Sequence, residues 1–171
     1  MTYQTFGPRS QSRVRKPDRG FTLIELMVAL VLLALILTAA APIMQLNAKR
    51  TQEQELKRAL WEIRDAIDDY KEAADQGLIK KQPDQTGYPP TLQILVQGVE
   101  NKRDPKKGKV YFLRRIPRDP FATDATLANE ETWGKRSYSS SFEQPEAGDD
   151  IYDVYSLSPQ IGINQRPYRE W

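Results

Sequence analysis

The side chains in this sequence that most readily act as general acids or bases near neutral pH are carboxylates. The 171 residues include no cysteine and no histidine, which excludes disulfide bonds, thiolate nucleophiles, imidazole bases and zinc sites that need imidazole. Three pairs of carboxylates are adjacent in the chain: Asp68-Asp69, Glu130-Glu131 and Asp149-Asp150. Because adjacent side chains do not converge as a general acid and its base must, we predict no catalytic residues and no enzyme.

One carboxylate, Glu25, stands out by its position at the head of an apolar segment. The 23 residues from Leu26 to Ala48 carry no charge. As a helix they would reach about 35 Å, slightly more than the roughly 30 Å hydrocarbon core of a bilayer. We therefore predict a transmembrane helix over residues 21–48. A carboxylate there either marks the interfacial end of the span or has a partner.

The segment before this helix is basic. Residues 1–20 contain five Lys or Arg and one Asp, so the positive-inside rule predicts a cytoplasmic N-terminus and an exported C-terminal part. A secretory signal peptide and a permanent single-span anchor are alternatives to a leader that is cut on the cytoplasmic side. Ordinary signal peptides have an apolar region of about 7–15 residues, whereas this one is longer and its start is interrupted by Glu25.

The string Arg19-Gly20-Phe21-Thr22-Leu23-Ile24-Glu25-Leu26 resembles the class III signal of type IV pilins and type II secretion pseudopilins. The resemblance implies that a prepilin peptidase cuts after Gly20 and methylates the new N-terminal Phe21. It also implies that Glu25 meets the N-terminus of a neighbouring subunit and sets the filament register. Opposite charges lower the cost of burying each other. Pro42, which should kink the helix, lies where pilin-like proteins commonly carry a proline.

A second helical pattern follows the apolar segment. Residues 49–76 repeat apolar side chains at spacings of three and four, which predicts the amphipathic half of one long helix. Gly77 should end it. The charged residues between the apolar ones, from Glu53 to Lys71, are expected on solvated faces. The predicted stripe is Leu56, Leu60, Ile63, Ile67, Tyr70 and Ala74.

The remaining chain, residues 77–171, is predicted to form a globular head. A short helical turn is expected at Leu92–Val96 and a solvated basic loop at Asn101–Lys109. Three runs rich in β-branched or aromatic residues predict strands that form a small antiparallel sheet on the long helix. The fold class is therefore α+β, and the resemblance implies that it is pilin-like. The three runs are Lys109–Leu113, Arg136–Ser141 and Asp150–Leu157.

Head motifs extend the resemblance to the major, G-type pseudopilins of type II secretion. Asp119, Pro120 and Phe121 match that family's LPxDPW segment. Trp133, Gly134 and Tyr138 match its WGxxY segment, here displaced by a 12-residue stretch. The family binds calcium in the C-terminal loop, yet residues 156–169 contain no carboxylate. We therefore expect no cofactor, keep calcium as an open alternative, and name no metal ligand.

The resemblance implies a structural filament subunit of a type II secretion pseudopilus. The expected partners are further copies of the chain, other pseudopilins, the prepilin peptidase, the inner-membrane assembly platform and, before assembly, membrane lipid. The expected location is the inner membrane, single-pass with the head in the periplasm, and then the periplasmic pseudopilus. The absence of cysteine favours a pseudopilin over a disulfide-closed pilin. Without residues 1–20, 20 basic and 22 acidic residues remain.

Three alternatives stay open. The first is a type IV pilin, major or minor, in a surface fibre for adhesion, motility or DNA uptake. The second is a membrane-anchored periplasmic binding module that never polymerises. Nucleic-acid binding is less favoured because the charge of the head is balanced. Its candidate residues would be Lys102, Arg103, Lys106, Lys107, Lys109, Tyr111 and Phe112.

Overall fold

The computed structural model describes residues 20–81 and 85–171, without the side chains of residues 38–43. The predicted leader therefore lies outside the described residues, apart from Gly20. The chain divides into two units, Met1–Ile43 and Met44–Trp171. The helix α1 (Leu23–Asp75) contributes residues to both units, and each unit is described by itself.

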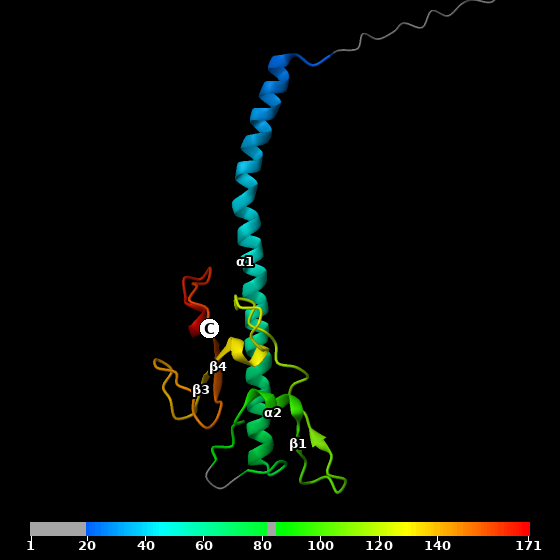
Figure 1. Ribbon diagram of the computed structural model, residues 1–171, viewed down its shortest axis with the longest axis vertical. Coiled ribbons are helices and arrows are strands. Elements are labelled where there is room, and N and C mark those ends of the chain that lie inside the picture. Colours follow the sequence, from blue (N-terminus) through cyan, green and yellow to red (C-terminus); the bar gives the residue numbers. More distant parts are fainter. Residues whose placement is uncertain (1–19, 82–84) are drawn as a thin grey trace, which may run out of the picture. The chain divides into compact units, whose positions relative to one another are not determined.

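In the first unit, α1 begins at Leu23 (Figure 1), and its first turn is capped by Thr22. The Thr22 hydroxyl accepts a hydrogen bond from the Glu25 N–H at 3.3 Å, and the Thr22 carbonyl accepts one from the Leu26 N–H at 3.1 Å. A threonine followed three residues later by a glutamate is typical of a helix N-terminus, where a negative side chain also interacts favourably with the helix dipole. Thr22 and Glu25 thus start the helix locally.

The apolar side chains of this unit are exposed as far as they are described, from Phe21 to Leu37. Among the residues open to description, we find no helix with both the length and the hydropathy that a bilayer crossing requires. The predicted kink at Pro42 falls among residues 38–43, whose side chains lie outside the description, and it stays a prediction.

In the second unit, α1 buries the predicted apolar stripe. All six stripe residues are buried, and Leu56, Ile63 and Ile67 are inaccessible to solvent. The helix ends as predicted, because Gly77 adopts a positive φ of 70°. The Leu78 N–H then bonds to the Ala73 carbonyl at 2.9 Å, and the Gly77 N–H bonds to the Ala74 carbonyl at 3.1 Å. This pair of bonds is the Schellman motif, which satisfies the last carbonyls of a helix.

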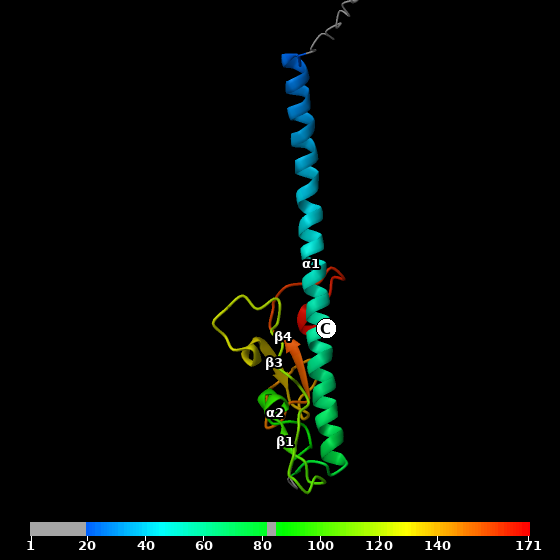
Figure 2. The same ribbon diagram turned by 90° about the vertical axis from the view of Figure 1, so that its right-hand side faces the viewer.

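The head packs against the stripe of α1 (Figures 1 and 2). Leu95, Trp133 and Val154 join the helix residues in one hydrophobic core. The predicted α+β class, with short antiparallel strands packed on a long helix, is confirmed. The elements of the head are α2 (Leu92–Gln97), β1 (Val99–Glu100), β2 (Lys109–Val110), the 3₁₀ helix η1 (Asn129–Thr132), β3 (Trp133–Arg136), β4 (Asp153–Ser156) and the 3₁₀ helix η2 (Tyr168–Glu170).

The strands form two sheets of two, rather than the single sheet predicted. β1 pairs antiparallel with β2, and β3 pairs antiparallel with β4, with Gly134 opposite Tyr155. The predicted strand at 109–113 is only the two residues of β2, and the one at 150–157 is the four residues of β4. The short helix α2 is confirmed.

The strand predicted at Arg136–Ser141 is wrong beyond its first residue. β3 lies earlier and ends at Arg136. The Ser137 hydroxyl donates to Asp150 at 2.8 Å, and the Ser140 N–H bonds back to the Ser137 carbonyl at 3.1 Å. Serine side chains often bond to nearby groups and favour turns, and here they replace the ladder that the sequence pattern suggested.

Candidate functional site

Gly20 and Phe21, the predicted cleavage site, make no packing contact with the part of the chain that the structure describes that would explain their residue types. A Cβ at Gly20 would have no heavy atom within 4 Å, and Gly20 is not among the glycines with positive φ. Phe21 is 84% exposed. Neither sterics nor packing therefore requires a glycine followed by a phenylalanine here. Both residues are therefore free of packing contacts that a second molecule would have to displace.

Glu25 is also open to a partner. Its side chain is exposed, and it forms no ion pair with any residue in the part of the chain that the structure describes. Its backbone N–H donates to the Thr22 hydroxyl oxygen. The exposed apolar side chains that follow it form the kind of contiguous surface that marks an interaction site. The carboxylate could therefore bind an α-amine of a second chain without breaking an internal contact.

Of the head motif residues, Asp119 is the centre of a buried polar network. Its side chain is 1% exposed. One carboxylate oxygen accepts the Phe121 N–H at 2.8 Å and the other accepts the Ser156 hydroxyl at 2.6 Å. The Asp119 N–H in turn donates to the Thr132 hydroxyl oxygen at 3.2 Å. Asp119 thus ties the turn at 119–122 to β4 and η1.

Three more motif residues pack around this network. Phe121 stacks on Tyr168 with ring centroids 4.1 Å apart. Trp133 is 3% exposed and donates its indole N–H to the Pro117 carbonyl at 2.8 Å. A Cβ at Gly134 would lie 2.3 Å from the ring of Tyr155, so a larger residue there would have to displace that ring. These residues hold the head together.

Tyr138 lies apart from the other motif residues, although the sequence pattern places it with them. It is 59% exposed and belongs to a cluster of three tyrosines. Its ring centroid is 5.6 Å from those of both Tyr88 and Tyr152. Pro120 has no side-chain role in the network beyond its place in the turn between Asp119 and Phe121.

A buried glutamate that the sequence analysis placed on a solvated face fixes the C-terminal segment. Glu53 is 8% exposed. One of its carboxylate oxygens accepts the Ile163 N–H at 2.7 Å and the Tyr168 hydroxyl at 2.9 Å. Burial and this hydrogen bond raise the pKa of Tyr168 above its ordinary value. Glu53 precedes Leu56 by three residues and so continues the spacing of the buried stripe. That spacing is the sequence signal that indicates its burial.

Further side chains of α1 bind the same segment. The Lys49 ammonium donates to the Ile161 carbonyl at 2.7 Å. The Arg64 guanidinium donates to Asp153 at 2.8 Å and to the Trp171 main-chain oxygen at 2.7 Å. The C-terminal segment is therefore held to the helix by direct contacts along one side of α1.

Replacing Glu53 with alanine should lower the free energy of unfolding by about 2 kcal/mol, because the buried Tyr168 hydroxyl and the part-buried Ile163 N–H would lose their acceptor. Chemical denaturation of the purified chain measures this change. The matched control is Glu55→Ala, since Glu55 is exposed on the same helix turn and its removal should change stability by less than about 0.5 kcal/mol. Equal effects of the two substitutions would contradict the assigned role of Glu53.

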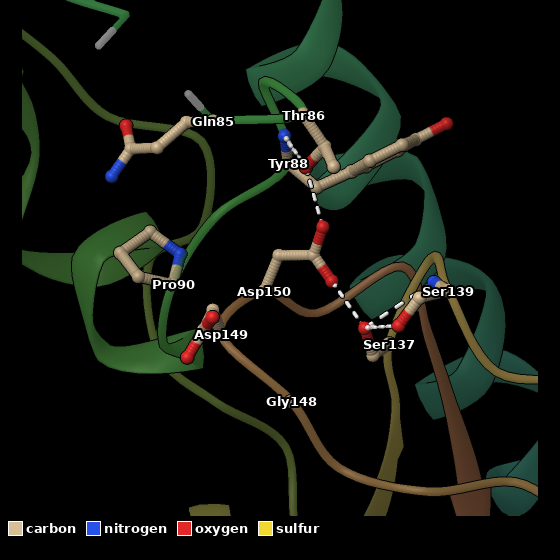
Figure 3. Close-up of a pocket in the computed structure, with 9 residues that line it drawn as sticks. All are labelled: Gln85, Thr86, Tyr88, Pro90, Ser137, Ser139, Gly148, Asp149 and Asp150. Atoms are coloured by element: carbon tan, nitrogen blue, oxygen red, sulfur yellow. Dashed lines mark hydrogen bonds between the residues drawn. The ribbon is translucent and has the colours of Figure 1, made fainter. Parts of the chain in front are cut away.

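A polar cavity of about 460 Å³ lies between the segment before α2 and the segment before β4 (Figure 3). Asp150 on its wall accepts hydrogen bonds from the hydroxyls of Thr86 and Ser137 and from the Tyr138 N–H. Burial alone raises the pKa of Asp150, but these hydrogen bonds outweigh it and hold the pKa below its usual value. Asp150 is thus an internal acceptor.

The adjacent carboxylates do not form acid–base pairs. Figure 3 shows the side chains of Asp149 and Asp150 pointing in different directions. Glu130 pairs with Lys135 at 3.1 Å, whereas Glu131 accepts the Ala128 N–H at 2.9 Å. Among the described residues, no group of three or more acidic side chains lies close enough together to hold a metal ion.

The basic loop of the head is folded on itself and largely exposed. The Asp104 carboxylate accepts the N–H groups of Lys106 and Gly108 at 2.9 and 3.0 Å. Phe112, a candidate for stacking on bases, instead packs edge-on against Tyr70 at 5.3 Å. Tyr111 is the remaining exposed ring, so the loop offers little of a stacking platform.

Comparisons with known proteins agree with this geometry at both ends of the chain. Residues 15–41 match the family model described as the prokaryotic N-terminal methylation motif. Over 143 residues the chain is 27% identical to the type II secretion system core protein G of Klebsiella michiganensis, which covers 80% of this chain and 93% of that protein. The chain is thus similar to this core G protein over most of its length.

Other core G proteins are similarly related. The protein of Pectobacterium carotovorum is 29% identical over 157 residues, which are 90% of this chain and 83% of that protein. The Escherichia coli protein is 28% identical over 145 residues, 81% of this chain and 92% of that protein. No solved structure matches this chain significantly. The likeness to these pseudopilins therefore includes the head as well as the N-terminal motif.

Proposed function

We propose that this chain is a structural filament subunit of a type II secretion pseudopilus, which drives protein export across the outer membrane. The observation that carries the proposal is the sequence Gly20-Phe21 with Glu25 at the head of an exposed apolar helix. Beyond the start of the helix, the arrangement has no packing role among the described residues, and it coincides with the methylation motif. The relatives' name, type II secretion system core protein G, supports the choice of machine.

In this proposal the prepilin peptidase removes residues 1–20 and methylates Phe21, while the chain is held in the inner membrane by its apolar helix with the head in the periplasm. Assembly on the inner-membrane platform then transfers the helix from lipid to contacts with other copies and other pseudopilins. The positive amine of Phe21 in one copy meets Glu25 of a neighbour. Pairing lowers the cost of burying both charges, so the assembled state is favoured.

The proposal assigns no catalysis and no cofactor. The carboxylates with internal partners act as hydrogen-bond acceptors or salt-bridge partners, as Glu53, Asp119 and Asp150 show. Calcium fits poorly in the C-terminal segment, because residues 156–169 contain no carboxylate and hard cations favour carboxylate oxygens. Glu53 and Arg64 fix that segment instead.

The test compares cells with and without the gene. Loss of the gene should stop the release of folded exoproteins into the medium, and a plasmid copy should restore it. Normal secretion together with loss of surface fibres would instead support a type IV pilin. Normal secretion with unchanged fibres, and no filaments on overexpression, would support an anchored module that never polymerises.

A further inference from the structure

The basic residues of the head are concentrated in one stretch of the chain. Residues 101–115 contain seven Lys or Arg and one acidic residue, Asp104, whereas residues 21–171 as a whole contain 20 basic and 22 acidic residues. All seven basic side chains are exposed. Together with Tyr111, we call them the basic surface. The seven are Lys102, Arg103, Lys106, Lys107, Lys109, Arg114 and Arg115.

The fold leaves most of the charge of the basic surface uncompensated. The Asp104 carboxylate accepts the N–H groups of Lys106 and Gly108, in its own loop. Within the described ranges, the basic surface forms one ion pair, between Lys107 and Glu100 at 3.5 Å, and both side chains are exposed. Exposed pairs of this kind contribute little to stability. The charge of the other six basic side chains is therefore available to a negatively charged partner.

Tyr111 provides an apolar contact within the basic surface. Its side chain is 64% exposed, yet its ring lies close to the backbone of Gly98, where a Cβ would be 2.8 Å from it. A groove of about 530 Å³ beside the ring is also lined by Val96 and Phe112. An exposed tyrosine offers a large contact area at a low cost in conformational entropy. The basic surface therefore has the composition of a protein-binding surface.

The matching charge lies in the segment that follows β3. Residues 138–149 contain three acidic residues and no basic one. The acidic residues, Glu143, Glu146 and Asp149, are exposed and form no ion pair with any described residue. The same segment exposes Tyr138 by 59% and Phe142 by 55%. We call these five residues the acidic surface.

The charge of the acidic surface is not neutralised by its surroundings. Asp149 lines the polar cavity of Figure 3, and no basic residue is among the described residues of that wall. Arg136, at the end of β3, is already paired with Asp153 at 3.1 Å. The acidic surface is therefore open to cations from another molecule.

The two surfaces lie on opposite sides of α1. In Figure 1, β1 and the loop after it lie to the right of α1, whereas β3 and the segment after it lie to the left. In Figure 2 the head as a whole lies on one side of α1. Each copy therefore presents its basic residues on one flank of the head and its acidic residues on the other.

The two surfaces also reach α1 at different heights. The Lys102 N–H bonds to the Leu78 carbonyl at 2.8 Å, just beyond the end of the helix. On the other flank, Tyr138 stacks on Tyr88 at 5.6 Å. The Lys71 ammonium lies 5.5 Å from the centre of the Tyr88 ring. Seven helical residues, from 71 to 78, correspond to about 10 Å along the axis.

We propose that the basic surface of one copy of this chain binds the acidic surface of a second, parallel copy. The copy that supplies the acidic surface is displaced by about 10 Å toward the C-terminal end of α1. The inference rests on the proposed function, which makes a second copy the neighbour and gives both copies the same direction. It adds to that function the two head surfaces that meet and the displacement between the copies.

This contact can continue from copy to copy. Because the two surfaces are different and lie on opposite flanks, one copy binds one neighbour through its basic surface and another neighbour through its acidic surface. A heterologous contact with a displacement along the axis gives an open filament. A nucleic acid or an anionic lipid would use the basic surface alone and would leave the acidic surface without a partner.

A charge exchange tests the pairing in the full chain. Lys102→Glu/Lys106→Glu reverses two charges of the basic surface, and Glu143→Lys/Glu146→Lys reverses two of the acidic surface. Each variant opposes like charges, so each should lower the yield of sheared filaments at least about fivefold. The chain with all four substitutions should restore the yield to within about twofold of the wild type. Immunoblots of membranes check that every variant is present.

The matched control is Lys80→Glu/Arg169→Glu, which changes the net charge as much as the basic-surface variant does. Both positions are exposed and outside the two surfaces, so filaments should form at the wild-type level. Unchanged yields in the two reversal variants, or no recovery in the fourfold variant, would contradict the pairing. Loss confined to the basic-surface variant would also contradict it and would support a nucleic acid or lipid partner. Equal loss in the control would contradict it too, because net charge would then be the cause.

Cross-linking tests which flanks meet, because the chain has no cysteine of its own. The variant Lys106→Cys/Glu146→Cys carries one thiol on each surface. A bis-maleimide, which joins two thiols, should convert its filaments into a ladder of multimers, since every copy is linked on both flanks. Each single-cysteine variant should give no ladder. Filaments of the double variant that yield only monomers or dimers would overturn the proposal.

The outcomes separate this inference from the proposed function. Wild-type filaments that contain the chain, together with a double-cysteine variant that builds filaments but no ladder, would reject the contact between the two surfaces and leave the pseudopilin role intact. A wild-type chain that never enters filaments would reject the pseudopilin role, and the contact between copies with it.

Discussion

Replacing Asp119 with alanine should lower the free energy of unfolding by about 3 kcal/mol, the largest loss of stability expected from a single polar side chain of the head. The substitution removes the acceptor of two donors, the Phe121 N–H and the Ser156 hydroxyl. A buried donor without a partner costs about 1–3 kcal/mol. Such a loss is a large share of the roughly 5–15 kcal/mol that stabilises a typical domain. Chemical denaturation of the purified chain measures it.

The control for Asp119 is Asp124→Ala. Asp124 makes the same kind of local turn, accepting the N–H and hydroxyl of Thr126, but it is exposed. Its loss should cost less than about 1 kcal/mol. Ser156→Ala removes one of the two donors together with its hydrogen bond. Its loss of stability should therefore lie between those of Asp119→Ala and Asp124→Ala. If Asp119→Ala were no worse than Asp124→Ala, the buried network would not be what holds β4 to the turn.

Replacing Glu25 with alanine should abolish filament assembly while leaving processing at Gly20 intact. In the proposed filament the carboxylate neutralises the buried amine of Phe21 on a neighbouring copy, and an unpaired buried charge costs several kcal/mol. The helix itself should survive, because the Thr22 cap uses the backbone N–H of residue 25, which alanine retains. Immunoblots of sheared filaments and of membranes measure assembly and processing separately.

The conservative variant Glu25→Gln separates charge from shape. It keeps the size of the side chain and the cap but removes the negative charge, so it should fail in assembly as alanine does. Glu55→Gln, on an exposed helix position, is the matched control and should assemble normally. Abundant filaments of normal appearance from Glu25→Gln would show that the charge does not set the register.

The helical part of the fold was predictable because its signals are periodic and local. The buried stripe from Leu56 to Ala74 follows the helical repeat over many turns, and Gly77 supplies the positive φ that ends it. Glu53 departs from the expected solvated face because its spacing continues the buried stripe. Its carboxylate is satisfied there by Tyr168 and Ile163.

The sheets were less predictable because their strands are short. β1 and β2 have two residues each, too few to show an alternating pattern. The local sequence around Ser137 predicts a strand. In the structure, however, its hydroxyl donates a hydrogen bond to Asp150, 13 positions later. Contacts between residues so far apart in the chain leave no local pattern. The resemblance to a known family points to the motif around Asp119, and the structure explains it by the buried hydrogen bonds that Asp119 accepts.

The measurement that tests the central claim most directly is the mass of the N-terminal peptide of this chain, taken from purified filaments. A processed pseudopilin subunit should begin at Phe21 and carry one methyl group on its amine, and Gly20→Val should leave residues 1–20 attached and the chain absent from the filaments. A filament-derived chain that retains its first 20 residues, or that begins at another residue, would contradict the account.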